Sequence, residues 1–154
     1  MIEIGDFQDF LIEKPLCLIF WNLKTNLTGL IEYLKNKGFE VKGIKNVKEL
    51  LYWLNTANVE VILLGASNID EIKEIKEFLD EKLPIEKRRD IFVAYVVPKG
   101  KTLHPKEVFL YSANLVVSEE HLEEFPRIYE RAVKYWESFY RNFKKAYNQI
   151  ASKL

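Results

Sequence analysis

The stretch Val59-Glu60-Val61-Ile62-Leu63-Leu64-Gly65 is apolar at nearly every position and ends on a glycine. A run of this length and character is typical of a β-strand that is buried on both faces, as in a parallel sheet covered by helices. A similar run, Leu16–Trp21, precedes it, and another follows over residues 90–97. Segments with helical spacing separate these runs, so the chain alternates strand and helix.

Three of the intervening segments carry signals for where a helix begins or ends. Residues 26–37 place apolar side chains on one helical face, and Gly38 suits the position just after a helix. Asn46 and Asn68 each stand three residues before a glutamate, an arrangement in which both side chains bond free amides at a helix start. The helix that begins at Asn68 is expected to continue to Leu83, before Pro84.

The remaining elements are shorter or weaker. Residues 39–44 alternate apolar and charged side chains, which predicts an edge strand. Pro105 fits the first turn of a short helix to Tyr111, residues 115–117 form a short strand, and a long helix follows from about Glu124. Five strand–helix units with crossovers of this length predict parallel strands and right-handed connections. We therefore predict a three-layer α/β (βα)5 sandwich of flavodoxin-like strand order 2-1-3-4-5, with an extended C-terminal helix.

Length and composition suit one domain without covalent or metal staples. The chain has 154 residues, of which 48% are hydrophobic, and its one cysteine, Cys17, lies within an apolar run and is expected to be buried. Neither the cysteine count nor the positions of His104 and His121 match a zinc site, so we expect no metal and no cofactor. Acidic residues stand where a signal peptide is basic, and no apolar run would span a membrane, which favours the cytoplasm. Abundant Lys and Glu with scarce Gln are a bias of thermophiles.

Charge is divided unevenly along the chain. Residues 127–154 carry seven basic and two acidic side chains, a net charge of +5, which leaves −5 on residues 1–126 because the whole is neutral. We expect an N-terminal segment over 1–14, an α/β body over 15–126, and an amphipathic helix over 127–154 that continues from the body.

With this layout the chain resembles a receiver domain of two-component signalling over about residues 15–130. Residues 59–65 are similar to the third strand of a receiver, and Ser112-Ala113-Asn114-Leu115-Val116-Val117-Ser118 is similar to the stretch leading into its fifth. More narrowly, residues 88–93 and 109–117 resemble uncharacterised bacterial proteins that join a receiver-like domain to an N-terminal zinc ribbon, although this chain shows no ribbon.

The residues that carry receiver chemistry are replaced in this chain. The resemblance implies two Mg²⁺-binding acids after the first strand, where Trp21 and Asn22 stand, and a phosphate-accepting aspartate at the position of Gly65. A Ser or Thr is implied at the end of the fourth strand, where the chain has Tyr95-Val96-Val97, and a Lys at the position of Ser118. Without a carboxylate or a cation, phosphoryl transfer has neither nucleophile nor charge neutralisation. The resemblance therefore implies a pseudo-receiver that is not an enzyme.

Neutral polar groups remain at the edge where such sheets bind ligands. We name Asn22, Gly65, Ser67, Tyr95 and Ser118 as candidate ligand-binding residues for a small polar molecule. The same residues equally suit loop and cap duties. A small-ligand sensor is therefore one alternative function.

The C-terminal helix suggests the preferred function. Its apolar stripe continues for about 27 residues, or about 40 Å, whereas a strand of five or six residues spans about 17–20 Å. The part of the stripe beyond the sheet is the predicted interface, formed by Phe139, Tyr140, Phe143, Tyr147 and Ile150. We expect a homodimeric protein-interaction module, such as an adaptor in bacterial signalling. Two alternatives remain: residues 1–14 could cover the stripe, or the basic face could bind nucleic acid.

Overall fold

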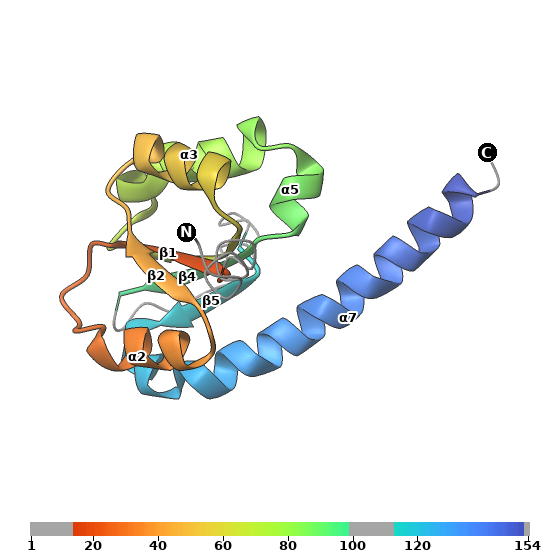
Figure 1. Ribbon diagram of the computed structural model, residues 1–154. Coiled ribbons are helices and arrows are strands. Elements are labelled where there is room, and N and C mark those ends of the chain that lie inside the picture. Colours follow the sequence, from red (N-terminus) through yellow and green to blue (C-terminus); the bar gives the residue numbers. More distant parts are fainter. Residues whose placement is uncertain (1–13, 99–112, 153–154) are drawn as a thin grey trace, which may run out of the picture.

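The computed structural model describes residues 14–98 and 113–152, which form a parallel five-stranded sheet between two layers of helices (Figure 1). The strand order is β2-β1-β3-β4-β5, and every neighbouring pair is parallel. The predicted (βα)5 fold class and the strand order 2-1-3-4-5 are therefore confirmed. The strands are β1 (Leu16–Trp21), β2 (Glu40–Gly43), β3 (Val59–Gly65), β4 (Phe92–Val97) and β5 (Leu115–Ser118).

Helices connect the strands and extend the chain beyond the last of them. Before β4 the helical elements are α2 (Thr28–Asn36), α3 (Val47–Thr56), the 3-10 turn η1 (Ile69–Ile72), α4 (Lys73–Glu77), the π-helical turn η2 (Phe78–Lys82) and α5 (Ile85–Arg89). After β5 come the 3-10 segment η3 (Glu119–Glu124) and the long helix α7 (Phe125–Ala151). The predicted helix over 105–111 lies outside the described residues.

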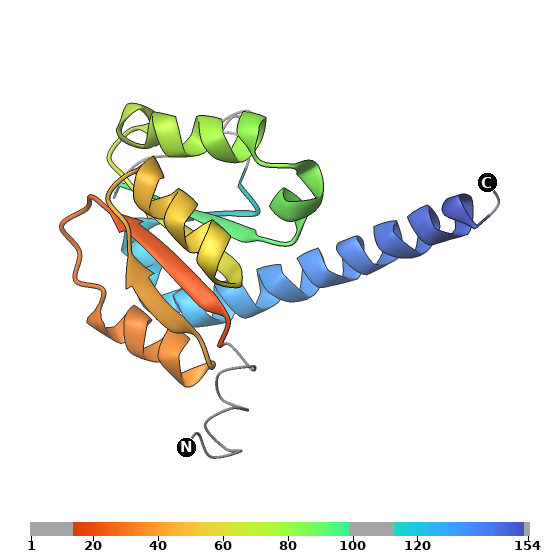
Figure 2. The same ribbon diagram turned by 45° about the horizontal axis from the view of Figure 1, so that its top comes forward.

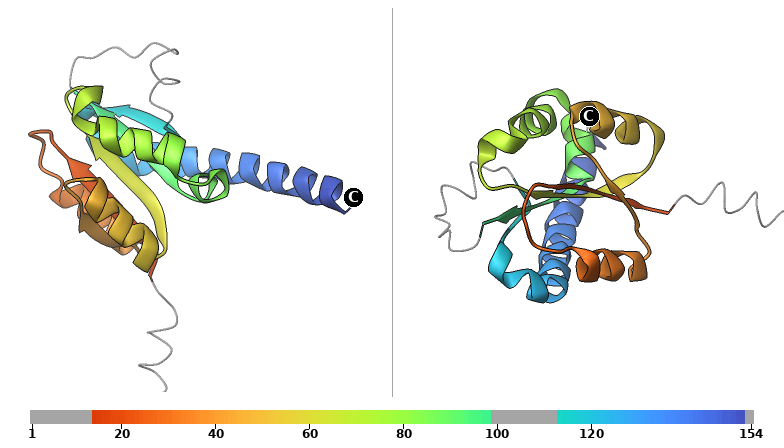
Figure 3. Two further views of the ribbon diagram at one scale, coloured as in Figure 1. Left: turned by 90° about the horizontal axis from the view of Figure 1, so that it is seen from above. Right: turned by 90° about the vertical axis from the view of Figure 1, so that its left-hand side faces the viewer.

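The sheet has a hydrophobic core on each face. On one face, Leu50 of α3 and Ile72, Ile75 and Leu79 of the η1–α4–η2 segment pack against the strands. On the other, α2 and the first turns of α7 pack on β1, β3 and β4 through side chains that include Leu34. Figures 2 and 3 show these layers on opposite sides of the sheet. The central strands are apolar at nearly every position because both of their faces are covered.

Both predicted asparagine caps are present. The Asn46 side chain accepts a hydrogen bond from the Glu49 amide, and Asn68 accepts one from the Glu71 amide, at 2.9 and 3.3 Å. Each glutamate carboxylate then reaches back to the amide just before its cap, that of Lys45 or Ser67. These bonds satisfy amides that a helix start leaves without an intrahelical partner.

Two details differ from the sequence expectation. The segment predicted as one helix from Asn68 to Leu83 changes from 3-10 to α to π geometry along its length. After Pro84 the chain forms α5, which the sequence pattern did not predict, so β4 begins at Phe92 and not at Asp90. Asp90 instead caps the C-terminus of α5.

Helix α7 begins against the sheet and continues well past it (Figure 1). Tyr129 is buried, and Ala132, Val133 and Trp136 are half-buried against the body, as expected for the proximal part of the stripe. Beyond Trp136 the helix projects away from the sheet for about four turns. Despite this length, neither α7 nor any other helix among the described residues is apolar enough to cross a membrane.

Candidate functional site

The candidate ligand-binding residues lie at the carboxyl edge of the sheet. The strand register places Trp21 beside Gly65, Gly65 beside Val96, and Val97 beside Ser118. The Asn22 amide donates a 2.8 Å hydrogen bond to the Gly65 carbonyl, which joins the ends of β1 and β3. Ser118 lies two strands away from Gly65, or about 10 Å at ordinary strand spacing. The topology therefore brings Asn22 and Gly65 into direct contact and leaves Ser118 farther along the same edge.

The indole of Trp21 fills the space above Gly65. A Cβ atom added to Gly65 would lie 2.3 Å from Cε3 and 2.4 Å from Cζ3 of that ring. Carbon atoms in ordinary van der Waals contact are about 3.5–4.0 Å apart. Any side chain at position 65, including an aspartate, therefore requires the indole to move.

Hydrogen bonds fix the Trp21 ring in this place. Its Nε1 donates to the Thr25 carbonyl at 3.0 Å. The Thr25 hydroxyl in turn donates to the Glu119 carboxylate, on the segment that follows β5. This chain of contacts ties the loop after β1 to the loop after β5, across the ends of the strands between them.

The two other candidate residues at this edge have different surroundings. The Ser67 amide donates a hydrogen bond to the Glu71 carboxylate as part of the helix cap, and Ser67 is exposed. Tyr95 is only 1% exposed and belongs to the core between the sheet and α3 and α4. At the positions where receiver chemistry needs a carboxylate and a cation, this edge presents Gly65 beneath the indole of Trp21, the amide of Asn22 and the hydroxyl of Ser118. A ligand crevice formed by the five residues stays a prediction.

The opposite, amino edge of the sheet carries a groove that the sequence analysis did not anticipate. It has a volume of about 450 Å³ and lies where α7 crosses the starts of β3 and β4. We call it the amino-edge groove. Its lining consists of Phe39, Asn58, Glu60, Val61, Asp90, Phe92, Tyr129, Val133, Trp136 and Glu137.

Aromatic rings form the floor of the amino-edge groove. The ring of Phe92 meets Tyr129 and Trp136 edge to face, with centroids 5.5 and 5.7 Å apart. Such contacts hold α7 against the first residue of β4 and are worth about 0.5–1.5 kcal/mol beyond the area they bury. The floor is therefore apolar.

The rim of the groove is acidic. Three carboxylates, those of Glu60, Asp90 and Glu137, contribute to the lining, whereas no lysine or arginine is among the described residues that form it. The pKa of Tyr129 is raised, chiefly by burial and further by the negative potential of groups that include Glu60 and Glu137. The groove thus combines a hydrophobic floor with a negative potential, which suits an apolar side chain next to a basic one.

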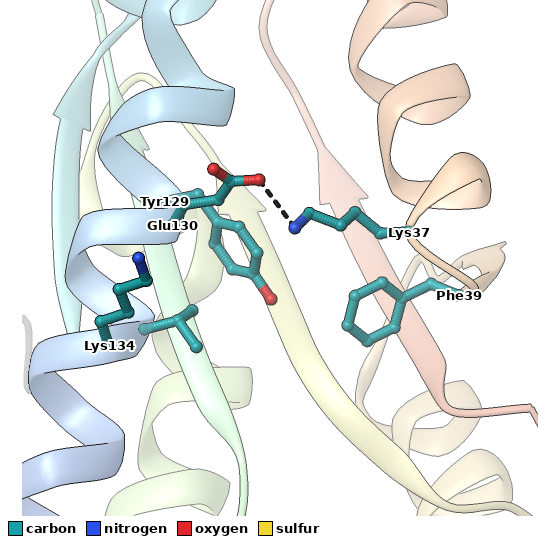
Figure 4. A pocket seen from close by; sticks show the side chains of 6 residues that line it. Lys37, Phe39, Tyr129, Glu130 and Lys134 are labelled. Carbon is teal, nitrogen blue, oxygen red and sulfur yellow. Dashed lines mark ion pairs between the residues drawn. The ribbon is translucent and has the colours of Figure 1, made fainter.

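A smaller pocket of about 380 Å³ adjoins the groove and shares Phe39, Tyr129 and Val133 with it. Figure 4 shows the ammonium group of Lys37 reaching across this pocket to the Glu130 carboxylate of α7, at 2.7 Å. The Tyr33 hydroxyl donates to the same carboxylate at 3.0 Å. These contacts connect α2 to α7 and lower the pKa of Glu130, first through Lys37 and then through Tyr33.

Two of the five predicted interface residues have described side chains, and both are exposed. Phe139 is 67% and Ile150 64% accessible on the part of α7 that has left the sheet. Tyr140, Phe143 and Tyr147 lie on the same helical segment, and their side chains are outside the description.

No metal site is apparent in the part of the chain that the structure describes, where no three His, Cys, Asp or Glu side chains gather suitably. Cys17 is fully buried, and burial raises the pKa of its thiol to about 12. A thiol in this setting stays protonated at neutral pH and is a poor nucleophile or ligand.

The groove could not be found from the sequence because it depends on where α7 crosses the sheet. Its lining comes from the loop before β2, from β3 and β4, and from α7. One signal was available: Asn58, Glu60 and Asp90 are polar residues at or just before the starts of otherwise apolar strands. Without the helix position, these residues only indicate strand ends.

Comparison with solved structures identifies the fold. The chain is similar to the signal receiver domain of a protein assigned as a LuxO repressor from Vibrio parahaemolyticus, with a TM-score of 0.55 and 12% identity over 80% of this chain and 93% of that one. It is also similar to HP1043, an orphan response regulator of H. pylori, with a TM-score of 0.51 and 15% identity over 79% and 99% of the two chains. No family model matches the chain, and no curated protein does. The fold is that of a receiver domain, as the sequence resemblance predicted.

Proposed function

We propose that this chain is a non-enzymatic protein-interaction module of the receiver fold, which forms a homodimer through α7 and acts without a phosphoryl switch. The observation that carries the proposal is the path of α7. Its apolar stripe packs on the sheet as far as Trp136 and then continues into solvent through Phe139 and Ile150. Large apolar side chains exposed on such a helix support an interaction site.

A second copy of the chain is the simplest partner for the distal stripe. An isologous contact about a two-fold axis needs only one self-complementary surface. The distal four turns of α7, which carry the exposed side chains of Phe139 and Ile150, could provide such a surface. The receiver fold supports a signalling adaptor role, since the similar solved structures are receiver and response-regulator domains.

Light scattering tests the dimer directly. We expect the mass of a dimer for the wild type at about 100 µM, and a shift toward the monomer for Tyr140→Ala with Phe143→Ala. Two aromatic anchors of an interface commonly cost at least about 2 kcal/mol together, which is about thirtyfold in affinity. The matched control is Ser138→Ala with Lys145→Ala, on the exposed polar face of the same segment, which should leave the mass unchanged.

The outcomes of this experiment separate cleanly. A wild type that is monomeric at this concentration contradicts the proposal. The circular dichroism of both variants should match the wild type, because no described side chain of α7 beyond Trp136 belongs to the core.

The absence of a phosphoryl switch has its own test. After incubation with Mg²⁺ and acetyl phosphate, the intact mass should not change, because Gly65 offers no carboxylate and Trp21 covers it. A stable gain of one phosphoryl group on a residue near Gly65 would refute this part of the proposal.

A further inference from the structure

The length of the amino-edge groove indicates the size of the segment that fits it. Helix α7 contributes Tyr129, Val133, Trp136 and Glu137 to the lining, and these residues share one face of the helix. From the first to the last of them the helix rises by about 12 Å. An extended segment of four residues spans about 13 Å. Two turns of a second helix, about 10 Å across, would occupy about twice the 450 Å³ of the groove, so the groove suits a short stretch of extended chain.

The floor and the rim of the groove require two kinds of side chain from such a segment. In an extended chain, successive side chains point to opposite sides. One set therefore faces the aromatic floor, which includes Phe92 and Trp136. The other set lies along the rim, which carries the carboxylates of Glu60 and Asp90 from the strand side and that of Glu137 from α7. A segment that alternates apolar and basic side chains satisfies both surfaces.

The negative charge is local to the groove. The Asn58 side chain donates a 3.3 Å hydrogen bond to the Glu60 carboxylate, and among the described residues Glu60 forms no ion pair, so its charge is not neutralised there. The adjoining pocket has the opposite balance, because two lysines, Lys37 and Lys134, line it together with Glu130 (Figure 4). A cation on this face of the molecule is therefore attracted to the groove and not to the pocket beside it.

We infer that the amino-edge groove binds an extended segment of a partner protein in which apolar and basic residues alternate. Arginine suits the basic positions best, because its guanidinium pairs with a carboxylate through two hydrogen bonds and also stacks on aromatic rings. Nucleic acids and anionic membranes carry the same sign of charge as the rim and are repelled by it. The inference rests on the proposed role as a protein-interaction module and is independent of the homodimer, since the groove lining ends at Glu137 and the distal stripe begins at Phe139.

Fluorescence anisotropy of a labelled peptide tests the groove in the full chain. The probe is a fluorescein-labelled peptide in which three arginines alternate with two leucines. We expect this peptide to bind, and its affinity to fall as salt rises, because the carboxylates of the rim are on exposed residues. One control peptide has glycines in place of the leucines, and the other has glutamates in place of the arginines. Each control should bind at least about tenfold more weakly.

Substitutions in the chain show whether the peptide lies in the groove. Glu60→Gln keeps the shape of the side chain, removes its charge and should weaken binding by about two- to fivefold. Val133→Arg places a cation in the groove itself and should weaken binding by at least about tenfold. The matched control is Glu81→Gln, at an exposed position of η2 in the opposite helical layer, which should leave the affinity unchanged. Circular dichroism checks the fold of each variant, and Glu60→Gln decides the question if Val133→Arg does not fold.

The other results overturn the inference, and each in a different way. No binding of the peptide up to about 1 mM, or equal weakening by Glu60→Gln and Glu81→Gln, shows that the groove takes no such segment. Displacement by free arginine amide at the same concentration as by unlabelled peptide assigns the groove to a small cation. A fall in the mass of the wild type by light scattering when the peptide is added assigns the groove to a second copy of the chain. A monomeric wild type that binds the peptide contradicts the homodimer alone and supports this inference.

Discussion

The two edges of the sheet differ in how accessible they are. At the carboxyl edge, where a receiver places its phosphate acceptor, Trp21 covers Gly65, and Thr25 and Glu119 tie the neighbouring loops together. At the amino edge, a groove of about 450 Å³ opens beneath α7, and the helix then leaves the body. Among the described residues, the carboxyl edge is thus covered at Gly65, while the amino edge carries an open groove. A fold determines where surfaces lie, and the side chains on each surface determine which one is used.

The largest expected effect concerns the floor of the open edge. Phe92→Ala should lower the free energy of unfolding by about 3–5 kcal/mol, because Phe92 is 2% exposed and joins β4 to Tyr129 and Trp136 of α7. Urea denaturation at a protein concentration too low for dimerisation measures this loss. The control is Phe139→Ala, which removes the same side chain where it is 67% exposed and should change the free energy by less than about 0.5 kcal/mol. A loss for Phe92→Ala as small as that for Phe139→Ala would show that α7 does not depend on the Phe92 contacts.

The next effect concerns the closed edge. Gly65→Ala should destabilise the protein by about 1–3 kcal/mol, since its new methyl group would overlap the indole of Trp21. The same substitution in a Trp21→Ala background should cost much less, and the difference between the two costs measures the closure. Gly29→Ala is the control, because no atom lies within 4 Å of the added carbon and alanine favours the helix α2. A Gly65→Ala variant as stable as the wild type would mean that the ring moves aside freely.

The sequence predicted the elements of the fold well because their signals are local. Apolar runs identified β1, β3 and β4, and the caps at Asn46 and Asn68 were predicted together with their glutamate partners. The fold class followed from the alternation of strand and helix, since short crossovers permit few topologies. Helix α5 was missed because its five residues show no apolar stripe and none of them is buried.

The candidate surfaces were predictable only in part, because they depend on distant residues meeting in space. The replacement of the acceptor by Gly65 was visible in the sequence, but the position of the Trp21 ring over it was not. The exposed stripe of α7 followed from helix length alone. The groove required the crossing of α7 over the starts of β3 and β4, which no local pattern specifies.

The smallest expected effect concerns the ion pair beside the groove, between Lys37 and Glu130. The Glu130 pKa is lowered in the folded chain, first by the hydrogen bond from Lys37 and then by that from Tyr33. A carboxyl group with a lowered folded pKa stabilises the fold above its unfolded pKa, and this contribution disappears as pH falls through the folded value. The Tyr33 pKa is raised to about 12, by burial and then by Glu130. The stabilisation of the fold by the protonated Tyr33 hydroxyl is therefore complete below the ordinary tyrosine pKa of 10.0 and is lost as pH rises through about 12.

The pH dependence of Glu130→Gln therefore tests whether this contact fastens α2 to α7. The variant should be slightly less stable than the wild type near neutral pH, and the two should converge as acid protonates Glu130 in the wild type. Because both side chains are about half exposed, salt should shrink the difference as well. Urea midpoints at neutral and acidic pH, with and without added salt, provide the measurement. Glu124→Gln is the matched control, since its carboxylate lies 3.3 Å from Arg127 on more exposed side chains and should contribute less. If the difference in stability between Glu130→Gln and the wild type persists unchanged into acid, the charge of Glu130 does not connect the two helices. Its packing against Tyr33 would then connect them.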